Sequence, residues 1–181
     1  MAISNHERVG KALELLRDGL APFVERELKS RYGDQWAFEV KDVLGETRLG
    51  TGKGSALKDS AALLVVMDRK WNEVFRKTLG KAERSLVNEL GDARNRWAHQ
   101  EPFSGDDADR ALDSCARLLT AVSATQADEV HKIKMELRRT MFDEQARGER
   151  RKVGNTALET TVTGNLKPWR EVITPHKDVA S

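Results

Sequence analysis

Cysteine is nearly missing from the sequence, since Cys115 is the only one among 181 residues. A single cysteine excludes an intramolecular disulfide framework and fits a reducing compartment, so we expect a cytoplasmic protein. Its neighbours, Ser-Cys-Ala-Arg-Leu-Leu, follow the pattern of an apolar helix face. This pattern favours a buried, unreactive thiol over a catalytic one.

Long apolar runs and a strong net charge are missing as well. No stretch approaches the roughly eighteen consecutive apolar residues of a membrane-spanning helix, and the N-terminus lacks the basic and apolar regions of a signal peptide. We therefore expect no membrane association and no export by a standard signal. Charged residues make up 33% of the chain, yet the net charge is only +2. Interspersed charges of this kind are typical of a soluble, mostly helical protein.

Metal-binding spacings are also missing. The four histidines are far apart in the sequence: His6, His99, His131 and His176. A zinc site needs ligands at short, regular spacing and usually more cysteine, so we expect neither a metal site nor a bound cofactor.

The glycine-rich segment 45–55 could in principle hold a phosphate. Its spacing does not match a P-loop, because Thr47 stands where the first glycine belongs and Gly54 replaces the hydroxyl residue after Lys53. We interpret this segment as a flexible loop.

Most of the remaining sequence has helical periodicity. Apolar residues recur every three or four positions, which predicts helices over residues 4–32, 57–69, 71–79, 81–99, 104–122 and 126–152. The segment 36–44 is ambiguous. Ser4 is a predicted N-cap, Ser104 and Asp107 form a predicted capping box, and Pro22 should kink or divide the first helix. The sequence therefore predicts an all-α fold.

The C-terminal part changes in character. Basic residues are frequent in the helix predicted over 126–152, but acidic residues alternate with them. This mixture favours a solvated or partner-facing helix over a dedicated nucleic-acid surface. After Val153 the periodicity ends among Gly, Asn, Thr and Pro. We thus expect one helical domain over residues 1–152 and a linker or irregular tail over residues 153–181.

The segment 92–101, with the sequence DARNRWAHQE, gathers polar side chains near the end of a predicted helix. At about 100° per residue, Asn95 and His99 share one edge of this helix, while Trp97 points toward the core. A histidine can transfer a proton, an arginine such as Arg94 can bind a phosphate, and an amide can orient either group. Solvated or helix-capping side chains are the alternative interpretation. One helix does not supply a second proton-transfer group for a phosphodiester, but a two-fold dimer would.

Residues 94–99, Arg-Asn-Arg-Trp-Ala-His, resemble the motif of the HEPN (higher eukaryotes and prokaryotes nucleotide-binding) superfamily, in which arginine and a polar residue precede a histidine. The similarity covers about residues 8–150 and is most specific over residues 71–119. The run from Leu86 to Leu119 is similar to the HEPN domains akin to the C-terminal domain of the eukaryotic nuclear mRNA-surveillance endonuclease. In bacteria such domains occur at the N-terminus of large ATPases in phage-defence islands.

The resemblance implies an up-and-down bundle of four to five main helices, a homodimer, and metal-independent cleavage of single-stranded RNA in a cleft shared by two motifs. It also implies the roles of three residues. His99 would transfer the proton, Arg94 would bind the phosphate and stabilise the transition state, and Asn95 would position both. One branch of the superfamily has a modified tyrosine two residues after the histidine, but Glu101 stands there in this chain.

Two alternatives stay open, because some HEPN domains do not cleave RNA. The domain could be a non-catalytic module that dimerises, senses RNA or a nucleotide, and regulates an attached ATPase, or it could serve as a dimerisation handle alone. Residues 166–181 resemble the segment that connects such domains to the ATPase. We therefore expect a portion of a longer anti-phage defence protein.

Overall fold

A computed structural model describes residues 3–45 and 57–163, with side chains up to Lys152. Apart from Gly45, the glycine-rich segment lies outside the described residues. The α-helices are α1 (Asn5–Tyr32), α2 (Trp36–Leu44), α3 (Ser60–Arg69), α4 (Lys81–Ala98), α5 (Gly105–Ala121) and α6 (Gln126–Thr163), and the short 3-10 helices are Gly33–Gln35 and Phe75–Lys77. Regular structure in the described ranges is entirely helical, which confirms the predicted all-α class.

The chain divides into two compact units, the first ending at Arg138 and the second beginning at Arg139. The first unit contains α1 to α5 and the start of α6, and the predicted site lies in it. The second contains the rest of α6, which continues to Thr163 rather than ending near residue 152 as predicted. The prediction placed this end too early because apolar periodicity indicates only which residues are buried. A helix that has already formed can extend beyond its buried part, since each added residue gains one backbone hydrogen bond. The domain boundary at 152/153 remains a prediction.

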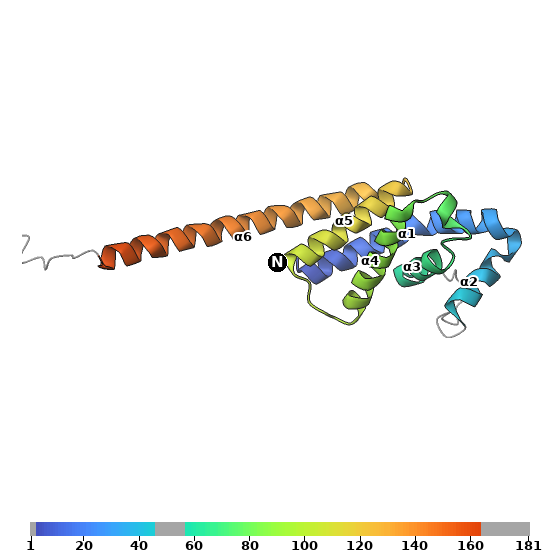
Figure 1. The fold of residues 1–181 in the computed structure, drawn as a ribbon, viewed down its shortest axis with the longest axis horizontal. Coiled ribbons are helices and arrows are strands. Elements are labelled where there is room, and N and C mark those ends of the chain that lie inside the picture. The colour runs from blue at the N-terminus through green and yellow to red at the C-terminus, as the bar shows by residue number, and fades with distance from the viewer. Residues whose placement is uncertain (1–2, 46–56, 164–181) are drawn as a thin grey trace, which may run out of the picture. The chain divides into compact units, whose positions relative to one another are not determined.

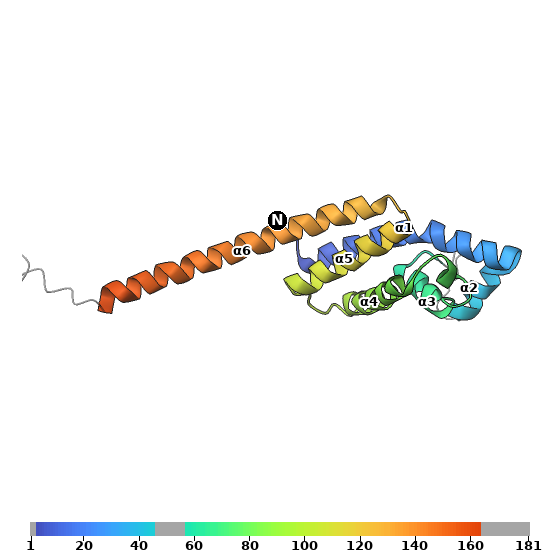
Figure 2. The same ribbon diagram turned by 45° about the horizontal axis from the view of Figure 1, so that its top comes forward.

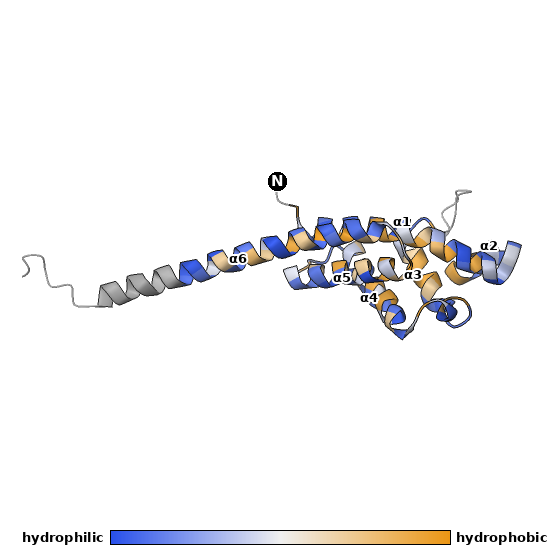
Figure 3. Cartoon of the chain, turned by 90° about the horizontal axis from the view of Figure 1, so that it is seen from above, coloured by the Kyte–Doolittle hydropathy of each residue, from blue (hydrophilic) through white to orange (hydrophobic). Residues whose placement is uncertain are grey.

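Within the first unit, α1 packs along α5, α3 packs along α4, and α4 contacts α5 (Figures 1 and 2). Hydrophobic residues gather where these helices face one another, as Figure 3 shows. The fully buried side chains come from every one of these helices and include Leu16, Leu20, Leu63, Leu90, Leu112 and Leu119. These contacts fix α4, the helix that carries the predicted site.

Capping signals in the sequence correctly mark two helix starts. Ser4 accepts a hydrogen bond from the Glu7 amide while the Glu7 carboxylate accepts one from the Ser4 amide. The same reciprocal pair forms between Ser104 and Asp107 at the start of α5. Each pair satisfies amides that a helix leaves without partners, so α1 and α5 begin at or next to the predicted residues.

Three local predictions need correction or completion. The segment 71–79 forms turns and the short 3-10 helix Phe75–Lys77 instead of an α-helix. The ambiguous segment 36–44 is α2. Pro22 lies inside α1 without dividing it, on the exposed side, where the missing N–H removes one hydrogen bond from an otherwise continuous helix.

The start of α6 is fixed on α5 by buried and charged contacts. Val130 and Leu137 are buried. Lys134 Nζ donates to Asp113 at 2.5 Å, and Arg138 donates twice to Asp109 at 2.6 and 2.8 Å. These two basic residues of α6 therefore pair with α5 and are not available to a ligand.

Candidate functional site

The end of α4 is anchored on the first turns of α1 by Trp97. The indole stacks on the His6 ring with 5.5 Å between the ring centroids and 18° between the planes. Gly10 provides the space for this contact, because a Cβ there would lie 2.8 Å from Trp97 Nε1. The Nε1 atom is buried and has no hydrogen-bond partner among the described residues. Trp97 thus anchors the helix end, as predicted, although it is half-buried against α1 and not deep in the core.

The chain leaves α4 through a Schellman motif. The Gln100 amide donates to the Trp97 carbonyl at 3.1 Å, and the Glu101 amide donates to the Arg96 carbonyl at 3.0 Å. Gln100 takes the left-handed conformation that this motif requires, with φ of 59°. A ring nitrogen of His6 also bonds the Trp97 carbonyl, at 3.1 Å. His99, between Trp97 and Gln100, therefore has a fixed backbone position.

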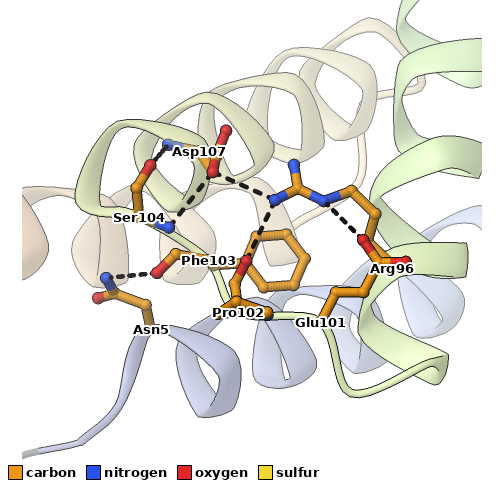
Figure 4. Close-up of polar contacts among 7 residues, drawn as sticks. All are labelled: Asn5, Arg96, Glu101, Pro102, Phe103, Ser104 and Asp107. Carbon is orange, nitrogen blue, oxygen red and sulfur yellow. Dashed lines mark hydrogen bonds and ion pairs between the residues drawn. The ribbon is translucent and has the colours of Figure 1, made fainter.

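Arg96 holds the loop between α4 and α5, as Figure 4 shows. Its guanidinium donates to the Pro102 carbonyl and to the Asp107 carboxylate, each at 3.2 Å, and lies 3.6 Å from Glu101. It also sits over the Phe103 ring, 4.8 Å from the centroid. These contacts use the Nη2 and Nε atoms of Arg96 and tie its guanidinium to the loop.

The ion pair with Arg96 has a clear electrostatic effect on Asp107. Hydrogen bonds from Arg96 and then from Ser104 lower the pKa of Asp107 from 3.8 to about 2. On the other side of the loop, the Asn5 side chain donates to the Phe103 carbonyl at 3.2 Å (Figure 4). The loop is therefore held by α1, α4 and α5 together.

Arg94 points to α3 and not to the loop. Its guanidinium donates to the Asp59 carboxylate at 3.1 Å, and its side chain is 27% exposed. Asp59 is the N-cap residue of α3, but its side chain makes no capping hydrogen bond. The Arg94 Nε atom is buried without a hydrogen-bond partner in the described part of the chain. Arg94 therefore pairs with α3 through one end of its guanidinium, while its Nε atom lies buried.

Asn95 and His99 are both exposed. Neither side chain forms a hydrogen bond or an ion pair with another described residue. Both are attached to a rigid helix end whose neighbours, Arg96 and Trp97, carry its structural contacts. Among the described residues, the helix end therefore presents an amide and an imidazole that no other side chain engages.

A pocket of about 410 Å³ lies between α3 and α4. From α3 it is lined by Ala61, Leu64, Val65, Asp68 and Arg69, and from α4 by Val87, Asn88, Gly91, Asp92, Arg94 and Asn95. The structure thus brings Arg94 and Asn95 together in one pocket. His99 is not part of the lining, so one chain does not place the three predicted residues around a single cavity.

Sequence reasoning missed Asp59 and His6. Asp59 directly precedes a helical segment, which marks an N-cap, but no local signal connects it with Arg94, 35 residues further on. His6 lies 91 residues before the carbonyl that it contacts. Tertiary packing brings Asp59 to Arg94 and His6 to Trp97, and the periodicity of the sequence does not predict such contacts.

Cys115 is buried, and burial raises the pKa of its thiol to about 12, as expected for a structural cysteine. Across the described ranges, no three or more His, Cys, Asp or Glu side chains are grouped so that they could hold a metal ion. None of the helices described is long and apolar enough to cross a membrane.

Comparison with known proteins places these features in a family. The Swt1-like HEPN family matches residues 11–123, a range that includes α2 to α5 and the Arg94 to His99 segment. No curated protein and no solved structure gives a significant match. The family match spans more than half of the chain and agrees with the helical bundle. We conclude that the chain belongs to the Swt1-like HEPN family.

Proposed function

We propose that this domain is a metal-independent endoribonuclease module that cuts single-stranded RNA at a site shared by two copies of the chain. Membership of the HEPN family supports either a ribonuclease or a nucleotide-binding module. On the resemblance of the sequence to HEPN domains of bacterial phage-defence ATPases, we further propose a cytoplasmic role in anti-phage defence, together with an attached ATPase.

The observation that carries this proposal is the division of roles along residues 94–99. Arg96 and Trp97 hold the helix end and its loop. Asn95 and His99 have no partner among the described residues, and the Arg94 side chain, 27% exposed, lines the pocket beside Asn95. Side chains that carry no structural contact on a fixed helix end, such as Asn95 and His99, can contact a ligand.

The proposed reaction is attack of a ribose 2′-oxygen on the adjacent phosphorus. The new O2′–P bond forms, the P–O5′ bond breaks, and the products carry a cyclic phosphate and a 5′-hydroxyl. One His99 accepts the 2′-hydroxyl proton, and His99 of the second copy donates a proton to the leaving 5′-oxygen. Arg94 stabilises the charge on the phosphate oxygens, and Asn95 orients the phosphate or the imidazole. The position of His99 outside the Arg94 pocket of one chain is consistent with such a composite site.

The test is cleavage of single-stranded RNA by the purified protein in excess EDTA. His99→Ala should reduce the rate by roughly 10²- to 10⁴-fold, the usual contribution of a proton-transfer group. His131→Ala is the matched control, because His131 is an exposed histidine on α6. Light scattering checks that both variants keep the wild-type mass. Undiminished cleavage by His99→Ala would contradict the assignment.

One observation favours the alternative, a non-catalytic module that senses RNA and regulates an attached ATPase. The guanidinium of Arg94 is already paired with Asp59 in the single chain. RNA binding by the wild-type protein without cleavage, also in the presence of its ATPase partner, would support this alternative.

A further inference from the structure

We infer that the pocket between α3 and α4 binds one unpaired nucleobase of the RNA strand whose phosphate Arg94 contacts. The inference rests on the proposed function for its ligand, RNA, and adds a base-selective subsite to it. It starts from the pocket itself, which has the size of a small-ligand site and includes Arg94 and Asn95 in its wall.

The two helices place the phosphate-binding residue at one end of the pocket. Arg94 pairs with Asp59 at the start of α3, whereas Arg84, earlier in α4, lies 3.9 Å from Asp68 near the end of α3. The helices therefore run antiparallel, and the pocket extends along them away from Arg94. A strand with its phosphate on Arg94 can direct an adjacent base into this space.

The pocket wall combines an apolar floor with polar edges. Leu64 and Val87 are 3% and 1% exposed and form the most buried part of the lining. Asn88 and Asn95 are seven positions apart on α4, so both amides face the same side of the helix. An aromatic base can cover the apolar floor while the amides bond its edge, since an amide offers both a donor and an acceptor.

The charged residues that line the pocket favour a neutral group, such as a nucleobase, over a chain of phosphates. Two arginines, Arg69 and Arg94, are balanced by two aspartates, Asp68 and Asp92. A pocket built for a polyphosphate would carry an excess of positive charge. Carboxylates can instead accept hydrogen bonds from the exocyclic amines of bases. The phosphate then belongs at the Arg94 end and the base in the pocket.

Gly91 keeps the pocket open. It lies inside α4, where glycine is unfavourable compared with alanine. A Cβ at Gly91 would meet nothing within 4 Å, so the position is not constrained by packing. A large side chain introduced here would project into the pocket without disturbing the core, which makes Gly91 the site for a test.

The experiment measures RNA binding in the His99→Ala background, so that no RNA is cut. The probes are fluorescent single-stranded RNA oligomers of roughly ten nucleotides, each with one base type, and a matching oligomer with abasic sites. Gly91→Leu should weaken binding of the preferred oligomer about ten-fold, the usual effect of removing one stacked base. It should also remove the difference between this oligomer and the abasic one.

Gly148→Leu is the matched control, because Gly148 is also a helical glycine whose Cβ would meet open space, on α6. It should leave binding and base preference unchanged. Asn88→Ala should change the order of preference among the four bases while keeping the fold. Thermal melts confirm that each variant is folded.

Three results would overturn the inference. Equal binding of the abasic and base-bearing oligomers to the His99→Ala protein would mean that the unchanged pocket holds no base. The same conclusion would follow if Gly91→Leu bound RNA as Gly148→Leu does. The pocket is a subunit contact if Gly91→Leu changes the molecular mass in solution. Failure of the nuclease proposal can be distinguished from failure of this inference. If the wild-type protein cuts no RNA but binding still depends on the base, only the nuclease proposal is wrong.

Discussion

Replacing Gly10 by alanine should loosen the end of α4 from a distance. The new Cβ would lie 2.8 Å from Trp97 Nε1 and 3.2 Å from two further indole atoms, distances at which the ring has to move. The same ring stacks on His6, so its displacement also disturbs the contact that holds the Trp97 carbonyl. We expect Gly10→Ala to destabilise the domain although alanine is the better helix former.

The size of the effect follows from three contributions. Alanine gains about 1 kcal/mol of helix propensity over glycine. Overpacking against the indole costs roughly 1–3 kcal/mol, and loss of the ring stack costs about 0.5–1.5 kcal/mol. The net loss is about 0.5–3.5 kcal/mol. At roughly 2–4 °C per kcal/mol for a chain of this size, the Tm should fall by roughly 1–14 °C.

Urea unfolding followed by tryptophan fluorescence measures this change, and Gly91→Ala is the control. Gly91 is also a glycine in a helix, but its Cβ would meet open space, so this variant should be about 0.5–1 kcal/mol more stable than the wild type. Combining Gly10→Ala with Trp97→Phe, which removes the contacted atoms, should recover part of the loss. If Gly10→Ala stabilises as much as Gly91→Ala, the contact between α1 and Trp97 does not fix the helix end.

Three further predictions concern the same region and the core. Asp107→Asn should lower the Tm at neutral pH, and its difference from the wild type should shrink as the pH falls from about 4 to about 2. The lowered pKa of Asp107 means that its stabilisation is complete above the unfolded value of 3.8 and is lost on protonation. Asp106→Asn breaks no ion pair with Arg96, so its difference in Tm from the wild type should change less with pH in the same melts. Gln100→Gly should raise the free energy of unfolding by about 0.5–1 kcal/mol in urea titrations, because glycine adopts positive φ without strain; no gain would argue against strain at this residue. The Cys115 thiol should react with a thiol reagent no faster than the domain unfolds, because it is buried and its pKa is raised to about 12; rapid reaction would contradict its burial.

Much of the fold could be predicted because its signals are local. The capping boxes at Ser4 and Ser104 need only three following residues, and the apolar periodicity of α4 and α5 is set by the helix itself. Segment 71–79 shows where this reasoning stops. Trp71, Phe75 and Leu79 are buried as their spacing predicts. The backbone around them nevertheless forms separate turns, such as the bond from the Arg76 amide to the Trp71 carbonyl at 2.8 Å.

The sequence alone proposes the residues of the candidate site, whereas their surroundings come from the tertiary structure. The spacing of Arg94, Asn95 and His99 on one helix follows from the sequence alone. The pairing of Arg94 with Asp59 and the pocket beside it depend on how α3 packs against α4, which no local pattern encodes. Sequence spacing therefore identifies which side chains are candidates, and tertiary structure shows which of them share a cavity.

The contacts of Asn5 and His6 with the α4–α5 region have a practical consequence for truncation. They join residues 98 and 91 positions apart, and the family match begins only at residue 11. A fragment trimmed to the matched residues would keep Arg94, Asn95 and His99 but lose the first two turns of α1. During synthesis, these two turns leave the ribosome before their partners, Trp97 and Phe103. The contacts that α1 makes with the helix end before His99 therefore require residues 5–10 in any fragment chosen for study.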